Sequence, residues 1–201
     1  TDAPRPLHHI SEMTVTQGNG ARYVFGLPAY NNLQRDVSFS VNENFVTSNV
    51  NDQNSSEYGL VAYERGKDNT VKNENGPDHV FDATNMPPYA HSFLLTGVLS
   101  PDYVDRTGDG ITDDDTGNAI KFNYHRWKEN FQWRIPTQFE RARYHEGNKA
   151  TKDDDKASYV YGQKEIWYAH SIESRTMLAQ FYLSDREDAL GVIDENGGRD
   201  V

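Results

Sequence analysis

Residues 159–188 read YVYGQKEIWYAHSIESRTMLAQFYLSDRED, with apolar and polar side chains alternating on both sides of a short polar turn, Glu173-Ser174-Arg175. Alternation with a period of two is typical of half-buried β-strands. In the first strand one face would carry Ile166, Tyr168, His170 and Ile172. In the second strand one face would carry Met177, Ala179, Phe181 and Leu183. The stretch therefore predicts two strands joined by a turn.

Strand patterns also recur upstream of this stretch. They lie at 13–16, within 21–30 (ARYVFGLPAY), at 36–41 (DVSFSV), at 92–99 (SFLLTGVL), at 119–127 and at 129–135. We expect 21–30 and 36–41 to form an antiparallel pair, with a loop or a bulge in LPAYNNLQR because that connection is too long for a two-residue hairpin. We expect a buried strand at 92–99 and two adjacent strands at 119–127 and 129–135. Helical turns are expected only at Arg141–Tyr144 or Asp185–Leu190. The predicted fold class is mainly β, an antiparallel meander or sandwich with long polar loops and little helix.

The size and composition fit one domain. The chain has 201 residues, of which 35% are hydrophobic and 12% aromatic, and the aromatic side chains can bury a large apolar area. We predict a single β-rich domain over 1–201, with 42–88 as a loop-rich excursion from the sheet. The charge run 152–156 (KDDDK) is expected to be a solvated loop. Polar ends and the absence of an initiator Met suggest a segment of a larger protein.

Charge and residue usage exclude several functional classes. A net charge of −11 disfavours nucleic-acid binding and anionic membrane surfaces. The sequence contains no apolar run of about 18 residues, so we expect no membrane insertion. The sequence has no cysteine, which excludes disulfides, thiolate catalysis and cysteine metal sites. A secreted domain without cysteine needs another means of stabilisation.

Residues 102–118 (DYVDRTGDGITDDDTGN), the Asp loop, supply a candidate. Counted from Asp105, oxygen-bearing groups fall at alternate positions and Gly110 stands at position six. Calcium prefers about six to eight oxygen ligands, and a tight loop with a glycine at its sharp bend can present them. The expected ligands are Asp105, Thr107, Asp109, the carbonyl of Ile111, Asp113 and Asp115, with Asp114 as an alternative to Asp115. The aspartates would also repel one another without a cation, so we expect structural Ca²⁺ here rather than Mg²⁺. A simple hydrophilic turn is the competing interpretation.

The Asp loop resembles the calcium loops of thrombospondin type 3 repeats, dockerins and EF-hands over about twelve residues. It departs from them at Thr107 and Thr116, where those families usually place Asp or Asn and a carboxylate, respectively. The flanking segments are predicted strands, whereas an EF-hand has helices. The resemblance implies a structural Ca²⁺ site in a loop that is not part of an EF-hand domain.

The C-terminal third also resembles strand-turn-strand units of very large secreted bacterial proteins, including Rhs/YD-repeat shells and toxin-like surface proteins. The resemblance rests on KEIWYAHSIESRTMLAQFYLSDRED, although the YD dipeptide is absent. It implies a secreted or cell-surface location, with other segments of a parent protein as partners. The expected function is a non-catalytic, calcium-stabilised structural or interaction domain, adhesive or part of a toxin shell.

Two alternatives remain open. A carbohydrate-binding or carbohydrate-active module would use exposed aromatic side chains to hold a glycan. The candidate platforms are Trp127, Trp133, Tyr124, Tyr144 and Trp167. A self-contained enzyme would need a cleft in which two acidic side chains titrate at mutually displaced pH values, and the sequence does not indicate which pair. No helical zinc-protease pair, nucleophile elbow or dinucleotide-binding glycine motif occurs. We therefore expect no catalytic residues.

Overall fold

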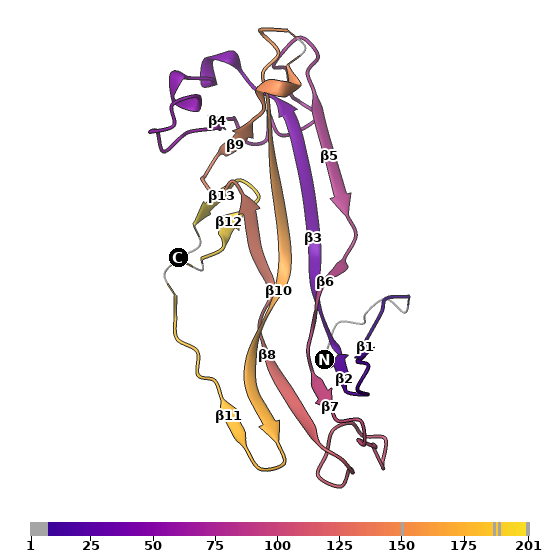
Figure 1. The fold of residues 1–201 in the computed structure, drawn as a ribbon. Coiled ribbons are helices and arrows are strands. Elements are labelled where there is room, and N and C mark those ends of the chain that lie inside the picture. Colours follow the sequence, from indigo (N-terminus) through magenta and orange to yellow (C-terminus); the bar gives the residue numbers. More distant parts are fainter. Residues whose placement is uncertain (1–7, 150, 187, 189, 200–201) are drawn as a thin grey trace. The chain divides into compact units, whose positions relative to one another are not determined.

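The computed structural model describes residues 8–149, 151–186, 188 and 190–199, and these residues form a mainly antiparallel β fold (Figure 1). The strands are β1 (Met13–Thr16), β2 (Arg22–Phe25), β3 (Leu27–Ser40), β4 (Leu60–Ala62), β5 (Phe81–Met86), β6 (Tyr89–Leu94), β7 (Gly97–Leu99), β8 (Ala119–Ile135), β9 (Arg141–Tyr144), β10 (Lys156–Ser174), β11 (Leu178–Gln180), β12 (Val192–Asp194) and β13 (Gly197–Arg199). The described residues contain no α-helix, only the 3-10 helices η1 (Glu43–Phe45), η2 (Ser48–Val50) and η3 (Glu146–Asn148). The predicted mainly β, antiparallel fold class is confirmed.

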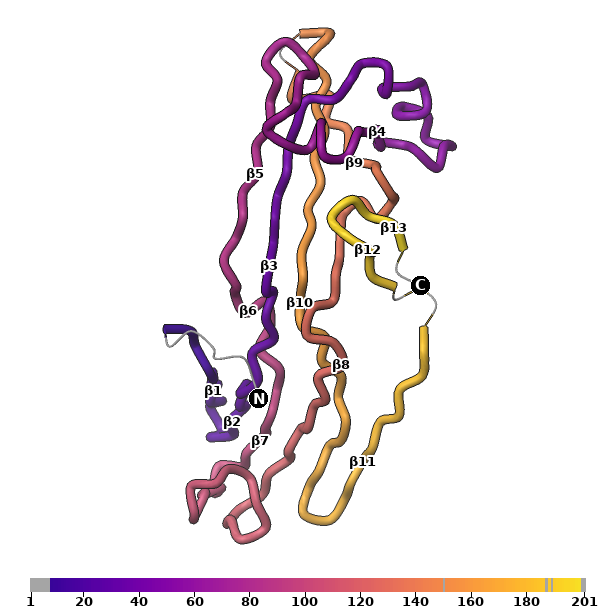
Figure 2. Tube along the Cα trace, turned by 180° about the vertical axis from the view of Figure 1, so that it is seen from behind, coloured from indigo at the N-terminus to yellow at the C-terminus, as the bar shows by residue number. Residues whose placement is uncertain are grey.

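Within the described residues, eleven strands form one sheet whose main path is β1-β2-β7-β8-β10-β3-β5. β12 and β13 form a separate hairpin. The chain divides into two compact units: unit 1 comprises the described residues of 1–30, 89–129 and 165–185, and unit 2 those of 31–88, 130–164 and 186–201. Figure 2 shows the path of β3, β8 and β10, each of which contributes residues to both units. The single domain expected over 1–201 stays a prediction.

The hydrophobic core of unit 2 forms where alternating side chains of β3 and β10 meet. Val37 and Phe39 of β3 are buried, as are Tyr159 and Tyr161 of β10. Residues of β4, β9 and β12 complete the cluster, including Val61, Ala142 and Val192. Phe39 contacts the edge of the Tyr63 ring at a centroid distance of 5.2 Å. The expected alternation at 36–41 is therefore confirmed as the buried face of a strand.

Arg134 of β8 lies inside the same unit with only 1% of its surface exposed. Its Nε donates to the carbonyl of Glu195 at 2.7 Å, and Nη1 donates to the carbonyl of Pro136. Its Nη2 donates to the Tyr63 hydroxyl at 3.2 Å, and the guanidinium lies 4.3 Å from the centroid of the Tyr159 ring. A buried cation is tolerated only when its donors are satisfied, and here carbonyl, hydroxyl and aromatic groups surround it.

Three predictions about the strands were wrong. The expected strands at 119–127 and 129–135 are one continuous strand, β8, because the polar residues between them are solvent-exposed and do not interrupt the backbone pairing. The expected pairing of 21–30 with 36–41 does not occur: β3 runs from 27 to 40 and pairs with β10 and β5, while β2 pairs with β1 and β7. A bulge does lie in the LPAYNNLQR segment, since the β3–β10 register shifts between Gln163 and Lys164. The segment expected as one strand at 92–99 is divided into β6 and β7.

The charge run 152–156 is not a fully solvated loop. Asp154 is 1% and Asp155 is 4% exposed, because each is paired with a lysine. Lys156 pairs with Asp154, and Lys149 Nζ lies 2.7 Å from Asp155 Oδ1. The hydrogen bond to Asp155 raises the pKa of Lys149. Paired charges can be buried where single charges cannot, so tertiary contacts overrode the local composition.

The remaining local predictions have mixed outcomes. Arg141–Tyr144 is the strand β9 rather than a helical turn, because it pairs with both β4 and β10. Asp185–Leu190 lies partly outside the described residues. Residues 42–88, expected as a loop-rich excursion from the sheet, contain η1, η2, β4 and β5. Both strands belong to the large sheet, and β5 pairs with β3. Among the described residues, no helix has the length and apolar character needed to cross a membrane.

Candidate metal site in the Asp loop

The Asp loop connects two neighbouring strands of unit 1, β7 and β8, which pair with Leu99 opposite Ala119. Main-chain bonds close its base: Ser100 N donates to the carbonyl of Asn118 at 2.8 Å. Further into the loop, Val104 and Thr116 form an isolated antiparallel β-bridge. Gly117 has a φ of +80°, and a Cβ there would lie 2.6 Å from the backbone of Tyr103. A glycine is therefore required where the two arms of the loop meet.

Asp105 organises the first half of the loop. Its Oδ1 accepts hydrogen bonds from the amides of Thr107 at 3.2 Å and Gly108 at 2.6 Å. Its Oδ2 accepts one from the amide of Gly110 at 3.1 Å. Gly110 has a φ of +92°, so the sharp bend predicted at position six is confirmed. The chain thus wraps around the first carboxylate of the predicted ligand series.

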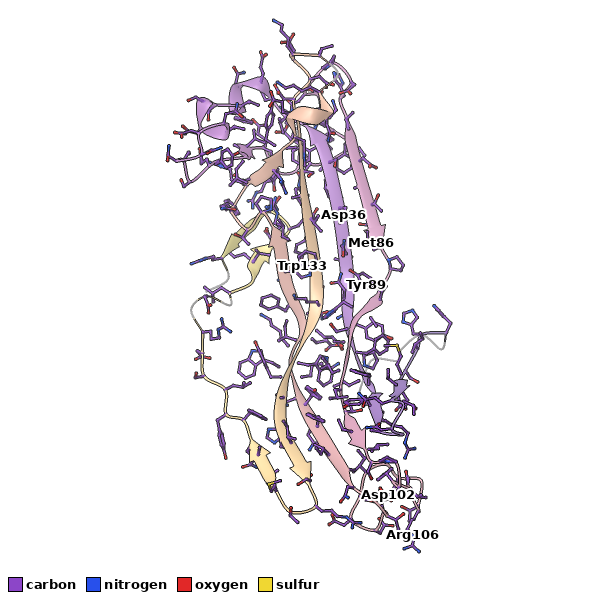
Figure 3. The ribbon with its side chains drawn as sticks, in the orientation of Figure 1. Asp36, Met86, Tyr89, Asp102, Arg106 and Trp133 are labelled. Carbon is purple, nitrogen blue, oxygen red and sulfur yellow. The ribbon has the colours of Figure 1, made fainter. Side chains whose placement is uncertain are left out.

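Asp115 organises the second half from the inside, with 4% of its surface exposed. Its Oδ2 accepts from the Tyr103 hydroxyl at 2.6 Å and from the Thr112 amide at 2.9 Å, and its Oδ1 accepts from the Arg106 amide at 3.1 Å. The Tyr103 hydroxyl and the Thr112 amide lower the pKa of Asp115. Burial, followed by the bond to Asp115, raises the pKa of Tyr103. Figure 3 labels Asp102 and Arg106 in this part of the chain.

The other predicted ligands lie on the outside of the loop. Asp109 is exposed, and its Oδ1 accepts from the Thr107 hydroxyl at 2.7 Å. Asp113 is also exposed, and the carbonyl of Ile111 accepts from Lys121 Nζ at 3.4 Å. Asp114 accepts from the Thr112 hydroxyl at 2.6 Å. Among the described residues, no three acidic or imidazole side chains converge as a metal-binding group. The loop brings Asp105, Thr107 and Asp109 together and turns Asp115 towards Tyr103.

Three basic side chains from other segments hold the loop, and sequence analysis missed all of them. Arg22 Nη2 donates to the carbonyl of Tyr103 at 2.7 Å across a separation of 81 residues. Lys121 donates to Ile111, and Arg175 donates to the carbonyl of Asp115. These cations reduce the mutual repulsion of the aspartates without a metal. No local pattern points to them, because each comes from a different strand or turn.

Residues of the loop also line a cleft in unit 1. The cleft has a volume of about 790 Å³. Tyr103 and Ile111 line it from the loop, Arg22 and Val24 line it from β2, and Phe122 lines it from β8. Charged and apolar groups therefore meet in this cleft, although Arg22 and Lys121 already have the loop carbonyls as partners.

The aromatic candidates differ in exposure. Trp127 is 57% exposed and, together with Tyr168, lines a hollow of about 250 Å³ in unit 1. The other candidates are only partly exposed and make polar contacts: Trp133 Nε1 donates to Asn31, Trp167 Nε1 to Glu165, Tyr124 to the carbonyl of Leu95 and Tyr144 to Asp155. Trp127 is thus the one predicted platform with a largely free ring.

No known protein family, curated protein or solved structure matches this chain.

Proposed function

We propose that the chain is a non-catalytic structural or interaction domain of a secreted or cell-surface bacterial protein, and that Ca²⁺ bound in the Asp loop stabilises it. The observation that carries the proposal is the wrapping of the loop around Asp105, with Gly110 at the bend. This backbone path brings Asp105, Thr107 and Asp109 together, and their oxygens are of the kind preferred by a cation that takes about six to eight oxygens.

The donor set fits a hard cation. Asp105, Thr107, Asp109, the Ile111 carbonyl, Asp113 and Asp115 would supply oxygen ligands, and three of the four carboxylates are exposed. Ca²⁺ at the Ile111 carbonyl would displace Lys121 Nζ, which lies at a long distance of 3.4 Å. The role of the ion would be to fix the β7–β8 connection against the charge repulsion of the loop. The partners would be other segments of the parent protein.

Thermal unfolding tests the proposal directly. The midpoint should rise when Ca²⁺ is added to chelator-treated protein, since a ligand at 100 times its Kd adds about 2.7 kcal/mol to the free energy of unfolding. Mg²⁺ at the same concentration should have a smaller effect. The double variant Asp105→Asn/Asp109→Asn should lose the response. Asp82→Asn, on an exposed position of β5, changes the charge without touching the loop and should keep it.

An unfolding midpoint that is the same with Ca²⁺ and with chelator would contradict the proposal. Isothermal titration of the wild type with CaCl₂ provides a second readout that does not depend on stability. Heat of binding that persists in the Asp105→Asn/Asp109→Asn variant would place the ion elsewhere.

A glycan-binding role is the second candidate, and the exposure of Trp127 above its hollow favours it. Its indole ring is available to stack on the apolar face of a neutral sugar, and the lining also contains the polar side chains of His125 and Gln180, the latter accepting a hydrogen bond from the Tyr182 hydroxyl at 3.0 Å. Binding of glycans on an array by the wild type, but not by Trp127→Ala, would support this role. A blank array for correctly folded wild type would refute it.

A further inference from the structure

The strand β11 forms an open edge in unit 1. It pairs with β10 on one side, with Ser171 opposite Gln180, and within the described residues no strand pairs with its other side (Figure 1). All three residues of β11 are exposed. The residues around it are also exposed and largely apolar, including Met177 (73%) and Tyr182 (88%). An exposed apolar edge of this kind is a template for pairing with another strand.

The hydrogen bonds of the hairpin show which backbone groups face outwards. The Ser174 amide donates to the carbonyl of Met177, and the Phe181 amide donates to the carbonyl of His170, each at 2.9 Å. In an antiparallel ladder, successive residues point their N–H and C=O groups to opposite sides. The main-chain groups of Leu178, Gln180 and Tyr182 therefore point away from β10.

The edge strand is short, with three residues in β11, but it has no charge or proline to prevent pairing. Residues 176–183 (TMLAQFYL) contain no charged residue and no proline, in a chain where 25% of residues are charged. Natural proteins usually protect exposed edges with Lys, Pro or a bulge. We name residues 176–183 the β11 edge. Its composition, β-forming and uncharged, resembles that of segments that pair with copies of themselves.

We propose that the β11 edge binds the β11 edge of a second copy of this chain, antiparallel, with the two-fold axis at Gln180. This register places Gln180 opposite Gln180 of the partner subunit and Leu178 opposite Tyr182 of the partner subunit. All of these residues present outward main-chain groups, so the pairing would form about six hydrogen bonds. A symmetric interface of this type is closed and stops at a dimer.

Charge favours the antiparallel arrangement. Arg175, which donates a hydrogen bond to the neutral carbonyl of Asp115 and keeps its charge, immediately precedes the β11 edge, and Asp185 lies just beyond its end. In the antiparallel dimer the Arg175 end of each copy lies beside the Asp185 end of the other copy. In a parallel arrangement the like charges would meet at each end, which is unfavourable. The β11 edge is therefore complementary to itself in one orientation.

Sedimentation equilibrium of the wild type, from micromolar to near-millimolar concentration, is the first test, and it should show a monomer–dimer equilibrium. Gln180→Pro removes an outward amide at the axis without removing a bond to β10, so it should abolish the dimer. Gln180→Ala keeps that amide and should still dimerise. Circular dichroism of each variant establishes that the fold is retained.

A charge exchange at the axis tests the register. Gln180→Lys and Gln180→Glu each place two like charges opposite one another, and each should weaken the dimer by about tenfold. An equal mixture of the two variants should restore it, since Lys would face Glu. A wild type that stays monomeric at all concentrations, a dimer unaffected by Gln180→Pro, or a mixture that stays monomeric would overturn the proposal.

Discussion

Replacing Arg134 by Met tests the reasoning about the core of unit 2. Met has a similar volume but has no donor, so the variant removes the cation while still filling much of its space. The groups that lose a donor are the carbonyls of Glu195, Pro136 and Gln138 and the hydroxyl of Tyr63. The Gln138 carbonyl keeps the Arg141 amide as a donor, at 3.4 Å. The Tyr63 hydroxyl can still donate to Asn196 Oδ1 at 3.3 Å. The main cost therefore lies in the carbonyls of Glu195 and Pro136.

The magnitude follows from those two groups. A buried carbonyl left without a partner costs about 1–3 kcal/mol, and because both of these carbonyls are only partly buried, the two together cost at most about 2–6 kcal/mol. Removing a buried charge recovers part of its desolvation cost, whereas leaving the opposite partner unpaired adds to the loss. Here Glu195 keeps Arg35, at 3.2 Å, as an ion-pair partner. We expect a net loss of about 3–5 kcal/mol, a large share of a typical total of about 5–15 kcal/mol.

Urea unfolding, followed by circular dichroism, measures this loss. Arg143→Met is the matched control, because Arg143 lies exposed on β9 and its replacement should change the free energy of unfolding by less than about 0.5 kcal/mol. Arg134→Lys keeps the charge but lacks the planar set of donors, so its stability should lie between those of the wild type and Arg134→Met. An Arg134→Met protein within about 1 kcal/mol of the wild type would refute the view that these hydrogen bonds stabilise the unit.

Two further predictions concern the same unit. Burial raises the pKa of Tyr63 to about 12 from its ordinary value of 10.0, and burial also raises the pKa of Tyr159. A raised pKa contributes stability that is complete below pH 10.0 and is lost as the pH rises towards 12, so the free energy of unfolding should fall over this range; an unchanged value would contradict the assignment. Gly162→Ala would place a Cβ 2.6 Å from the indole of Trp133 and should cost about 1–3 kcal/mol. Gly147→Ala, with no atom within 4 Å of the added Cβ, is the control, and equal melting temperatures for the two variants would show that the close contact is unimportant.

The local patterns of the sequence indicated many of the strands and one turn of the Asp loop, but not β9, which was expected as a helical turn. Two strands joined by a turn do occur in 159–188, as β10 and β11. The faces expected for them were wrong. Tyr168 and His170 of the expected apolar face of β10 are exposed, whereas Glu165 and Ser171 of the opposite face are buried. Met177, Phe181 and Leu183 are also exposed. The bend at Gly110 was predictable, since a positive φ is a property of one residue. Whether the loop binds Ca²⁺ stays a proposal.

These patterns did not predict which strands pair with one another. The sequence placed 21–30 beside 36–41, but β3 pairs with β10 and β5. Strand patterns state which side chains share a face and not which strand lies next, since pairing is chosen by the fit of whole faces across long separations. The sequence patterns also did not predict that β8 continues through its exposed polar residues, because that too depends on pairing with other strands.

The features that follow from the sequence alone are therefore local: the β class, the presence of many of the strands and the glycine at the bend. The compensation of charges depends on the tertiary fold. Arg22 reaches the Asp loop across 81 residues, Arg134 enters the core, and Asp154 is buried beside Lys156. The physical reason is that a charge is stabilised by whatever donors and acceptors the fold brings within a few ångströms, and the order of residues along the chain does not specify that neighbourhood.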